Sequence, residues 1–370
     1  MSTSNSLEKH TDPLIGRALG DFVIKSKLGE GGFGLVYRAE QTGLSREVVI
    51  KTLNTNTIEQ SPERFIQEAK LASRLEHPYT AHTYAFGVES DGLMWIAMEF
   101  VRGTSLDKLL EKQHTIPLER FVPLLDKLCE VIHTAHEYGI IHRDIKPANI
   151  MIISRAGRLM PKLLDFGIAK SFTNIITVEE ITEISSDPKT SAITSKHIQI
   201  RESDLTNTEL DDTLRLREDL DPDKTQEPDA IKTNNQKPKT SSAKLQADKT
   251  GIVGSPYYMP PEQWRSGGVL SPATDIYALA VLTFQALTGT FPFEGSLADL
   301  CQSHFYEEVP PLGKNFPPEL DQVIAKAMAK IPKARYATAL EFASAFRQAS
   351  GMGKERNQLP ELEETLRDEL

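Results

Sequence analysis

One short polar string carries the strongest sign of chemistry in this 370-residue sequence. Residues 142–149 read HRDIKPAN and lie between the apolar runs YGII and IMII. Chance or helix capping does not readily explain so many charged and amide side chains on one loop. Further on, LLDFG at 163–167 places a second acid, Asp165, at the end of another apolar run. Acids and cations in this order suit phosphoryl transfer, which needs positioned groups and neutralised negative charge.

A glycine cluster near the start of the chain could bind phosphate groups. Gly29, Gly31 and Gly34 form G-x-G-x-x-G, and glycines at these positions let backbone amides approach a phosphate. The same spacing marks dinucleotide-binding folds, where it opens a helix. Here the residues at 35–37 (LVY) continue as a strand, which favours a phosphate-covering loop between two strands. A plain glycine-rich hairpin remains an alternative from this cluster alone.

A lysine and a glutamate in the next two predicted elements could form a pair. Lys51 ends the apolar strand VVIK at 48–51, and Glu68 lies in the middle of a helix predicted from Ser61 onward. A lone strand lysine usually faces water, and an exposed ion pair contributes little stability. As an oriented pair across a cleft, the two residues could hold nucleotide phosphates.

Taken in order, these strings resemble the signatures of eukaryotic-type serine/threonine protein kinases, most closely those of the bacterial branch. The similarity covers about residues 22–346 and is interrupted by a polar insert. The resemblance implies an α+β, bilobal fold. A small antiparallel β-sheet lobe with one main helix would precede a larger, mainly α-helical lobe, with ATP in the cleft between them.

The resemblance also implies catalytic roles for the matching positions. Asp144 would accept or orient the substrate hydroxyl, with Lys146 near the transferred phosphoryl group. Lys51 would hold the α- and β-phosphates of ATP, and Glu68 would keep Lys51 in place. Mg²⁺, with Mn²⁺ as a possible substitute, would be held by Asn149 and Asp165.

The nucleotide pocket follows from the same resemblance. The glycine loop would cover the phosphates, Met98 resembles the gatekeeper, and the hinge would offer backbone groups to adenine. The expected nucleotide-binding residues are Gly29, Gly31, Gly34, Val36, Val49, Lys51, Met98, Glu99, Val101 and Met151. Val49 is bulkier than the alanine usual there, which could tighten the adenine pocket.

The segment GSPYYMPPEQW at 254–264, together with Lys146, matches the serine/threonine branch. Ser255 would contact the catalytic acid. Glu262 would pair with Arg335, and Asp275 would anchor the backbone of the catalytic loop. Pro260 replaces the usual alanine, which seldom matters while Glu262 is present.

Composition narrows the class of protein. The net charge of −10 argues against non-specific binding of nucleic acid, which needs a basic surface. The two cysteines, Cys129 and Cys301, give neither a disulfide framework nor a cysteine-based zinc site, as is typical of a reducing, cytoplasmic compartment.

No stretch approaches the roughly 20 apolar residues of a membrane span. The best candidate, 276–287, is shorter and is typical of a buried helix. We therefore expect no membrane insertion.

Composition also divides the chain. We expect a flexible leader at 1–20, a kinase domain at 21–348 (N-terminal lobe and hinge 21–101, C-terminal lobe 102–348) and an acidic tail at 349–370. Residues 171–250 contain no Gly, Trp, Tyr or Cys and are rich in Ser, Thr and charged residues. Such a segment cannot bury enough surface to offset its ordering entropy, so we expect a disordered insert within the activation segment.

The insert has two interpretations. It is either a passive insertion, since loop-closure cost grows slowly with length, or a regulatory tether. In the second case a phosphate on Thr250, or next on Thr240, Ser241 or Ser242, would pair with Arg143 and order the segment.

The favoured function is transfer of the γ-phosphoryl group of ATP to Ser or Thr of proteins. Autophosphorylation of the activation segment is expected with it, and a homodimer would allow this to occur in trans. The alternative is a catalytically silent kinase-fold scaffold. A small-molecule kinase of the same fold is a third possibility, which the peptide-binding segment at 254–264 disfavours.

Overall fold

A computed structural model describes residues 12–31, 34–53, 62–155, 158–165, 255–265 and 267–353. All of them belong to one of the two units into which the chain divides, residues 1–185 together with 249–370. The expected insert with its candidate phosphosites, and most of the acidic tail, lie outside the described residues.

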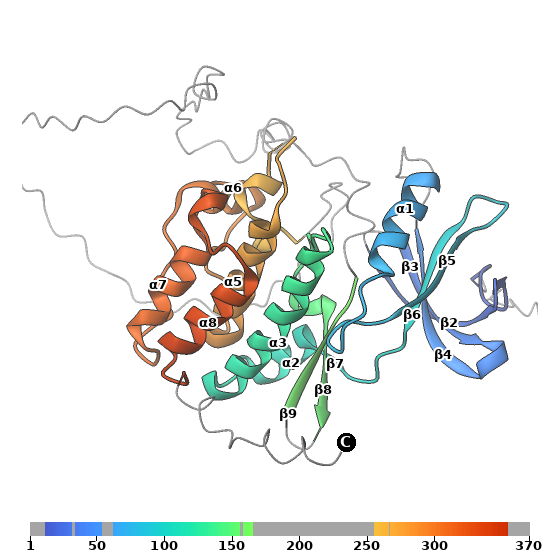
Figure 1. The fold of residues 1–370 in the computed structure, drawn as a ribbon, viewed down its shortest axis with the longest axis horizontal. Helices are drawn as coiled ribbons and strands as arrows, with labels where there is room; N and C mark the ends of the chain where they lie inside the picture. The colour runs from blue at the N-terminus through green and yellow to red at the C-terminus, as the bar shows by residue number, and fades with distance from the viewer. Residues whose placement is uncertain are drawn as a thin grey trace, which may run out of the picture. The chain divides into compact units, whose positions relative to one another are not determined.

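The N-terminal lobe is one antiparallel sheet of six strands in the order β1-β2-β3-β4-β6-β5 (Figure 1). The strands are β1 (Ala18–Leu19), β2 (Phe22–Gly31), β3 (Gly34–Gln41), β4 (Arg46–Leu53), β5 (Thr83–Val88) and β6 (Met94–Glu99). The expected pair of strands around the glycine cluster is confirmed as β2 and β3, in which Gly31 lies opposite Gly34.

Alternation along β4 decides which residues face the single helix of this lobe. Val48 and Ile50 are buried in a cluster on one face of the sheet. Val49 packs against a second cluster that contains Phe65 of α1 (Pro62–Ala72). Because successive strand residues point to opposite faces, Lys51 shares the face of Val49. Lys51, the lysine expected to bind phosphates, thus lies on the sheet face that α1 covers.

The described part of the leader is docked on this sheet. The carboxylate of Asp12 accepts a hydrogen bond of 2.9 Å from the hydroxyl of the buried Tyr37, and Leu14 packs against the neighbouring core. Arg17 forms an ion pair with Asp91, and β1 pairs with β2. Residues 12–19 of the expected leader therefore contact the sheet through a few apolar side chains, one part-buried hydrogen bond and one ion pair.

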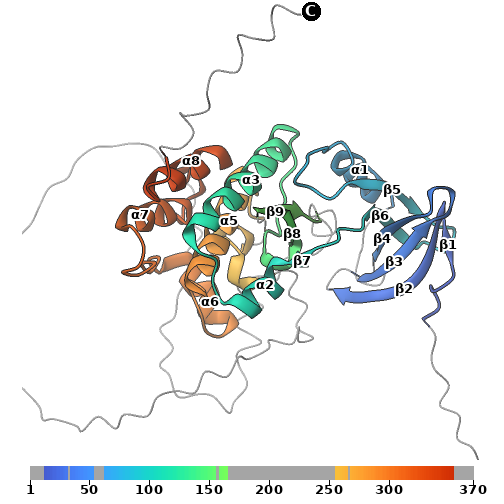
Figure 2. The same cartoon turned by 90° about the horizontal axis from the view of Figure 1, so that it is seen from below.

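The C-terminal lobe is mainly helical, and a three-stranded sheet, β7-β8-β9, lies between its helices and the N-terminal sheet (Figure 2). Its strands are β7 (Thr104–Ser105), β8 (Ile150–Arg155) and β9 (Arg158–Leu163). Its helices are α2 (Leu106–Gln113), α3 (Leu118–Glu137), α5 (Pro272–Thr288), α6 (Leu297–Tyr306), α7 (Pro318–Ala327) and α8 (Ala339–Ala349). The expected α+β, two-lobed fold is confirmed.

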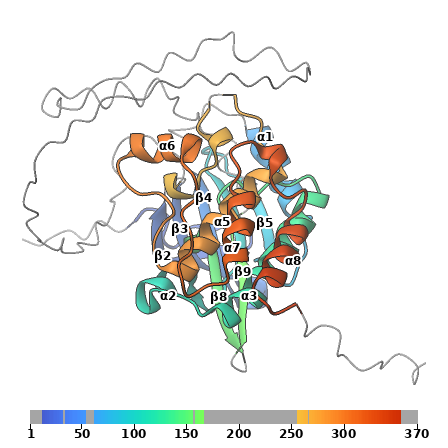
Figure 3. The ribbon, with the colours of Figure 1, turned by 90° about the vertical axis from the view of Figure 1, so that its left-hand side faces the viewer.

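Helix α5 is the centre of this lobe, with α3, α7 and α8 packed around it (Figure 3). From Thr274 to Leu287 every residue except Gln285 is buried. A helix that is apolar all round belongs in a core, so the prediction of a buried helix at 276–287 is confirmed. None of the helices among the described residues is long and apolar enough to cross a membrane.

Candidate active site

The expected catalytic loop lies between α3 and β8 and gathers its polar side chains around one carboxylate. Oδ2 of Asp144 accepts from Nδ2 of Asn149 at 2.9 Å and pairs with Nζ of Lys146 at 3.0 Å. Nδ2 of Asn149 also donates to the backbone oxygen of Asp144, at 2.8 Å. Two donors on one carboxylate oxygen fix its direction, and both donors are residues that the sequence singled out.

A buried acid on α5 holds the loop backbone. The side chain of Asp275 is only 1% exposed, and its oxygens accept from the backbone N–H of His142 at 2.8 Å and of Arg143 at 2.9 Å. The expected anchoring role of Asp275 is confirmed. A third contact, at 2.8 Å, comes from Nε2 of His136 on α3. Sequence reasoning missed His136, whose only signal was a histidine in the last turn of a helix.

His142 links the two acidic strings. Burial lowers the pKa of its ring, so the ring is neutral near pH 7. Nε2 lies 2.8 Å from the backbone oxygen of Leu164, and Nδ1 lies 3.3 Å from the backbone N–H of Asp144. A neutral ring satisfies both if Nε2 carries the proton and Nδ1 accepts. The catalytic loop and the residue before Asp165 therefore share one imidazole.

Asp165 lies beside Asn149 and has a cation as its partner. The N–H of Leu164 donates to the backbone oxygen of Asn149 at 2.8 Å, and Lys51 forms an ion pair with Asp165. Glu68 is a half-buried residue of α1, and the expected Lys51–Glu68 pair is not among the contacts of the described residues. The structure thus brings Lys51 to the acid of the second string.

The donors at this point suit a hard divalent cation. Asn149 turns its amide nitrogen toward Asp144, so its Oδ1 is the atom that could face a metal, and Asp165 adds carboxylate oxygens. Mg²⁺ prefers oxygen ligands of this kind. No group of three or more His, Cys, Asp or Glu that could hold a metal by itself occurs among the described residues. A magnesium ion bound here would depend on further oxygens from its substrate.

The expected nucleotide-binding residues line up across three neighbouring strands. Val36 lies opposite Lys51, and Val49 lies opposite Met98, so the pocket wall and gatekeeper positions are adjacent. Met98 and Val101 are buried, and Met151 lies on β8. The registers of β3, β4 and β6 therefore bring Val36, Val49, Lys51 and Met98 onto neighbouring strands.

Gly34 has a structural reason as well as the expected functional one. Its φ is 147°, and a Cβ there would overlap the carbonyl oxygen of Thr52 on β4. Gly29 has open space around it, so its packing alone does not require glycine. The close approach of β3 to β4 thus explains one glycine of the cluster without any ligand.

The side chain of Glu99 ties the hinge to β9. Its Oε2 accepts from Nζ of Lys162 at 2.8 Å and from the N–H of His82 at 3.2 Å. Nζ of Lys162 also donates to the backbone oxygen of Thr80, at 3.0 Å. Sequence reasoning missed Lys162, because nothing local to PKLL indicates a partner 63 residues earlier in the chain.

A small pocket lies at Asp144. Its lining consists of Arg143, Asp144, Ile145, Ser255, Tyr258, Met259, Gln263 and Ala278. Ser255, expected to contact the catalytic acid, therefore lines the same pocket as Asp144. The pocket lies where the expected catalytic loop meets the segment after the expected insert.

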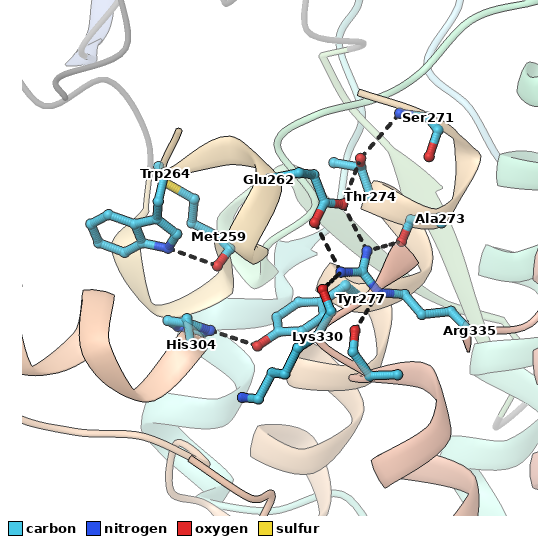
Figure 4. A network of polar contacts seen from close by, with 11 residues as sticks. Met259, Glu262, Trp264, Ser271, Ala273, Thr274, Tyr277, His304, Lys330 and Arg335 are labelled. Atoms are coloured by element: carbon cyan, nitrogen blue, oxygen red, sulfur yellow. Dashed lines mark hydrogen bonds and ion pairs between the residues drawn. The ribbon is translucent and has the colours of Figure 1, made fainter. Parts of the chain in front are cut away.

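The segment at 255–265 is fixed to the helical lobe by a buried ion pair (Figure 4). Arg335 donates to Oε1 of Glu262 at 2.7 Å and to Oε2 at 2.9 Å, with its own side chain 0% exposed. Arg335 also donates to the backbone oxygens of Ala273 and Ala329, both at 2.8 Å. The expected Glu262–Arg335 pair is confirmed.

Comparison with known proteins agrees with this arrangement. Residues 22–189 match the family model described as protein kinase domain. The chain is 31% identical over 360 residues to serine/threonine-protein kinase pkn3 of Myxococcus xanthus, a match that covers 94% of this chain and 53% of the relative. It is 29% identical over 333 residues to serine/threonine-protein kinase PrkC of Bacillus subtilis, covering 88% of this chain and 40% of that protein. The chain spans about half the length of the curated relatives it matches.

Solved structures support the fold. The crystal structure of the Mycobacterium tuberculosis PknI kinase domain has a TM-score of 0.58 to this chain at 20% sequence identity, and the match covers 90% of this chain and 98% of that one. The family model, the curated relatives and the fold agree. The chain contains a protein kinase domain and is similar to bacterial serine/threonine-protein kinases.

Proposed function

We propose that this chain transfers the γ-phosphoryl group of ATP to Ser or Thr hydroxyls of protein substrates. The observation that supports this most directly is the Asp144 carboxylate, held by Lys146 and Asn149 at 3.0 and 2.9 Å. Asp144 accepts or orients the proton of the attacking hydroxyl, which requires hydrogen-bond reach more than a shifted pKa. Lys146 places a positive charge beside the transferred group.

Lys51 and Glu68 are proposed to act on the nucleotide. Lys51 would neutralise the α- and β-phosphates, and Glu68 on α1 would serve as its carboxylate partner. Bound Mg²⁺ or Mn²⁺ would neutralise phosphate charge from Asn149 and Asp165. The adenine lies among Val36, Val49, Met98, Val101 and Met151, under the loop of Gly29, Gly31 and Gly34, with backbone groups of Glu99 and Val101 as its hydrogen-bond partners.

Phosphoryl transfer from labelled ATP to a generic protein substrate tests this function, with Asp144→Asn measured beside the wild type. Loss of a positioned general base typically lowers the rate about 10²- to 10⁴-fold. A silent scaffold would instead bind ATP with Mg²⁺ or Mn²⁺ and transfer nothing, and the variant would then equal the wild type. Absence of transfer with every metal and substrate tried would contradict the proposal.

Regulation belongs to the same proposal. We expect autophosphorylation of the activation segment, in trans between two copies, with Thr250 as the first candidate acceptor and Arg143 as the phosphate partner. Mass spectrometry after incubation with Mg-ATP identifies the acceptors, and full activity of Thr250→Ala would remove Thr250 from this role. The cytoplasmic location expected from the two cysteines stays a prediction.

A further inference from the structure

The peptide group between Arg143 and Asp144 is held at both of its ends by side chains. Nε2 of Gln263 donates to the backbone oxygen of Arg143 at 3.2 Å, across 120 residues of sequence. The N–H of the same peptide group, which belongs to Asp144, lies 3.3 Å from Nδ1 of His142. The carbonyl end of this peptide group, which precedes Asp144, is thus held by the segment at 255–265.

The backbone at this point needs such support. Arg143 has a φ of 65°, in the left-handed region that L-residues rarely adopt. Residues in such conformations persist where the surrounding contacts determine them. Asp275 holds the N–H of Arg143 from one side, and Gln263 holds its carbonyl from the other.

Gln263 is mounted on a rigid support. It ends the short helix η7 (Pro261–Gln263). On one side is Glu262, which pairs through both of its oxygens with Arg335, and on the other is the buried Trp264, whose indole N–H donates to the backbone oxygen of Met259 at 3.0 Å (Figure 4). The amide of Gln263 therefore reaches the catalytic loop from a fixed backbone.

We propose that Gln263 is a positioning residue for Asp144. Its amide fixes the rotation of the Arg143–Asp144 peptide group and so the direction from which the Asp144 side chain leaves the backbone. The expected effect on kcat rests on the proposed function, whereas the expected effect on the orientation of the peptide group rests on hydrogen bonding alone. Gln263 lines the pocket with Asp144 and Ser255, but it acts through the backbone.

Three substitutions separate donation from side-chain bulk. Gln263→Met keeps the length and removes the donor, Gln263→Glu turns an oxygen toward the Arg143 carbonyl, and Gln263→Lys keeps a donor. Loss of one such hydrogen bond from the reacting arrangement corresponds to about a tenfold fall in kcat. We expect that fall in the Met and Glu variants, with KM for ATP within about twofold of wild type, and retention of most of kcat in the Lys variant. Gln322→Met, at an exposed position of α7, is the matched control and should equal the wild type.

Hydrogen exchange at the Asp144 amide supplies a readout that does not depend on activity. In Gln263→Met this amide should exchange about tenfold faster, while amides of α5 exchange at the wild-type rate. Unchanged kcat and unchanged exchange in Gln263→Met would overturn the proposal. So would an equal loss of kcat in all three variants that follows a fall in Tm, because the side chain would then serve folding only. If the wild type transfers no phosphate, the proposed function fails, and the exchange experiment still decides the role of Gln263.

Discussion

The Glu262–Arg335 pair allows the sharpest test of the packing of the helical lobe. In Glu262→Gln the side chain keeps its shape, and the guanidinium of Arg335 keeps its charge in a fully buried position. Thr274 also donates to Oε1 of Glu262, at 3.0 Å, so the substituted amide must face donors from two sides.

The expected loss of stability in Glu262→Gln follows from the burial of the ion pair. Removing one partner of a buried ion pair usually costs about 3–5 kcal/mol, because the remaining charge is left uncompensated in a medium that solvates it poorly. For a domain of this size 1 kcal/mol shifts Tm by about 2–4 °C, so the fall in Tm should be on the order of 10 °C. The carbonyls of Ala273 and Ala329 still accept from Arg335 and place the expectation at the lower end of the range.

The measurement is urea unfolding at pH 7 with thermal melting beside it. The control is Arg347→Gln on α8, which removes another bidentate pair, with Asp126 of α3, in which both side chains are about a quarter exposed. Partly exposed pairs contribute about 1 kcal/mol or less. The double variant Glu262→Leu with Arg335→Met should lose less stability than the sum of the two single variants. A change below about 1 kcal/mol in Glu262→Gln, equal to that of Arg347→Gln, would refute the reasoning.

Three further expectations concern the glycine loop, the docked leader and pH. Gly34→Ala should weaken binding of an ATP analogue by at least about tenfold in calorimetry, because its Cβ would displace the Thr52 carbonyl. Gly29→Ala is the control, because a Cβ there meets open space and should leave the affinity closer to that of the wild type. In urea unfolding, Tyr37→Phe should lower the free energy of unfolding by about 0.5–1.5 kcal/mol and Asp12→Ala by about 1–3 kcal/mol. The second loss is larger because it leaves the Tyr37 hydroxyl without its acceptor, so equal losses would contradict this reasoning. Burial lowers the pKa of His304 to about 3, so the unfolded chain takes up a proton at this residue below about pH 6.5 before the folded chain does. Stability should fall as the pH is lowered from 6.5, by up to about 1.4 kcal/mol per pH unit, and His304→Gln should flatten that slope. An unchanged slope would assign the pH dependence to other groups, His142 among them.

Contacts within one short string were predictable, and contacts between distant strings were predictable only where the family resemblance supplied them. Asp144, Lys146 and Asn149 meet because the six residues 144–149 of one loop cannot separate far. Glu262 with Arg335, and Asp275 with the loop backbone, meet across 73 and more than 130 residues, and only the resemblance indicated them.

The contacts that sequence reasoning missed have no local signal. Gln263, His136 and Lys162 each have an ordinary type for their position, and each acquires its partner only when two lobes or two segments are packed together. Whether Lys51 pairs with Asp165 or with Glu68 depends on the position of α1 relative to β4. No pattern in the sequence predicts that position.

The bond from Glu99 to Lys162 links the expected hinge to the strand that leads to Asp165. Lys162 lies on β9, three residues before Asp165, and the same ammonium group also holds the backbone oxygen of Thr80. A compound that competes for the adenine position and displaces Glu99 must therefore pull on the strand that leads to Asp165. Compounds bound at the expected adenine position would fall into two groups, those that leave the Glu99–Lys162 bond intact and those that break it. Only the affinity of the second group should change with the magnesium concentration when the compound itself does not contact the metal.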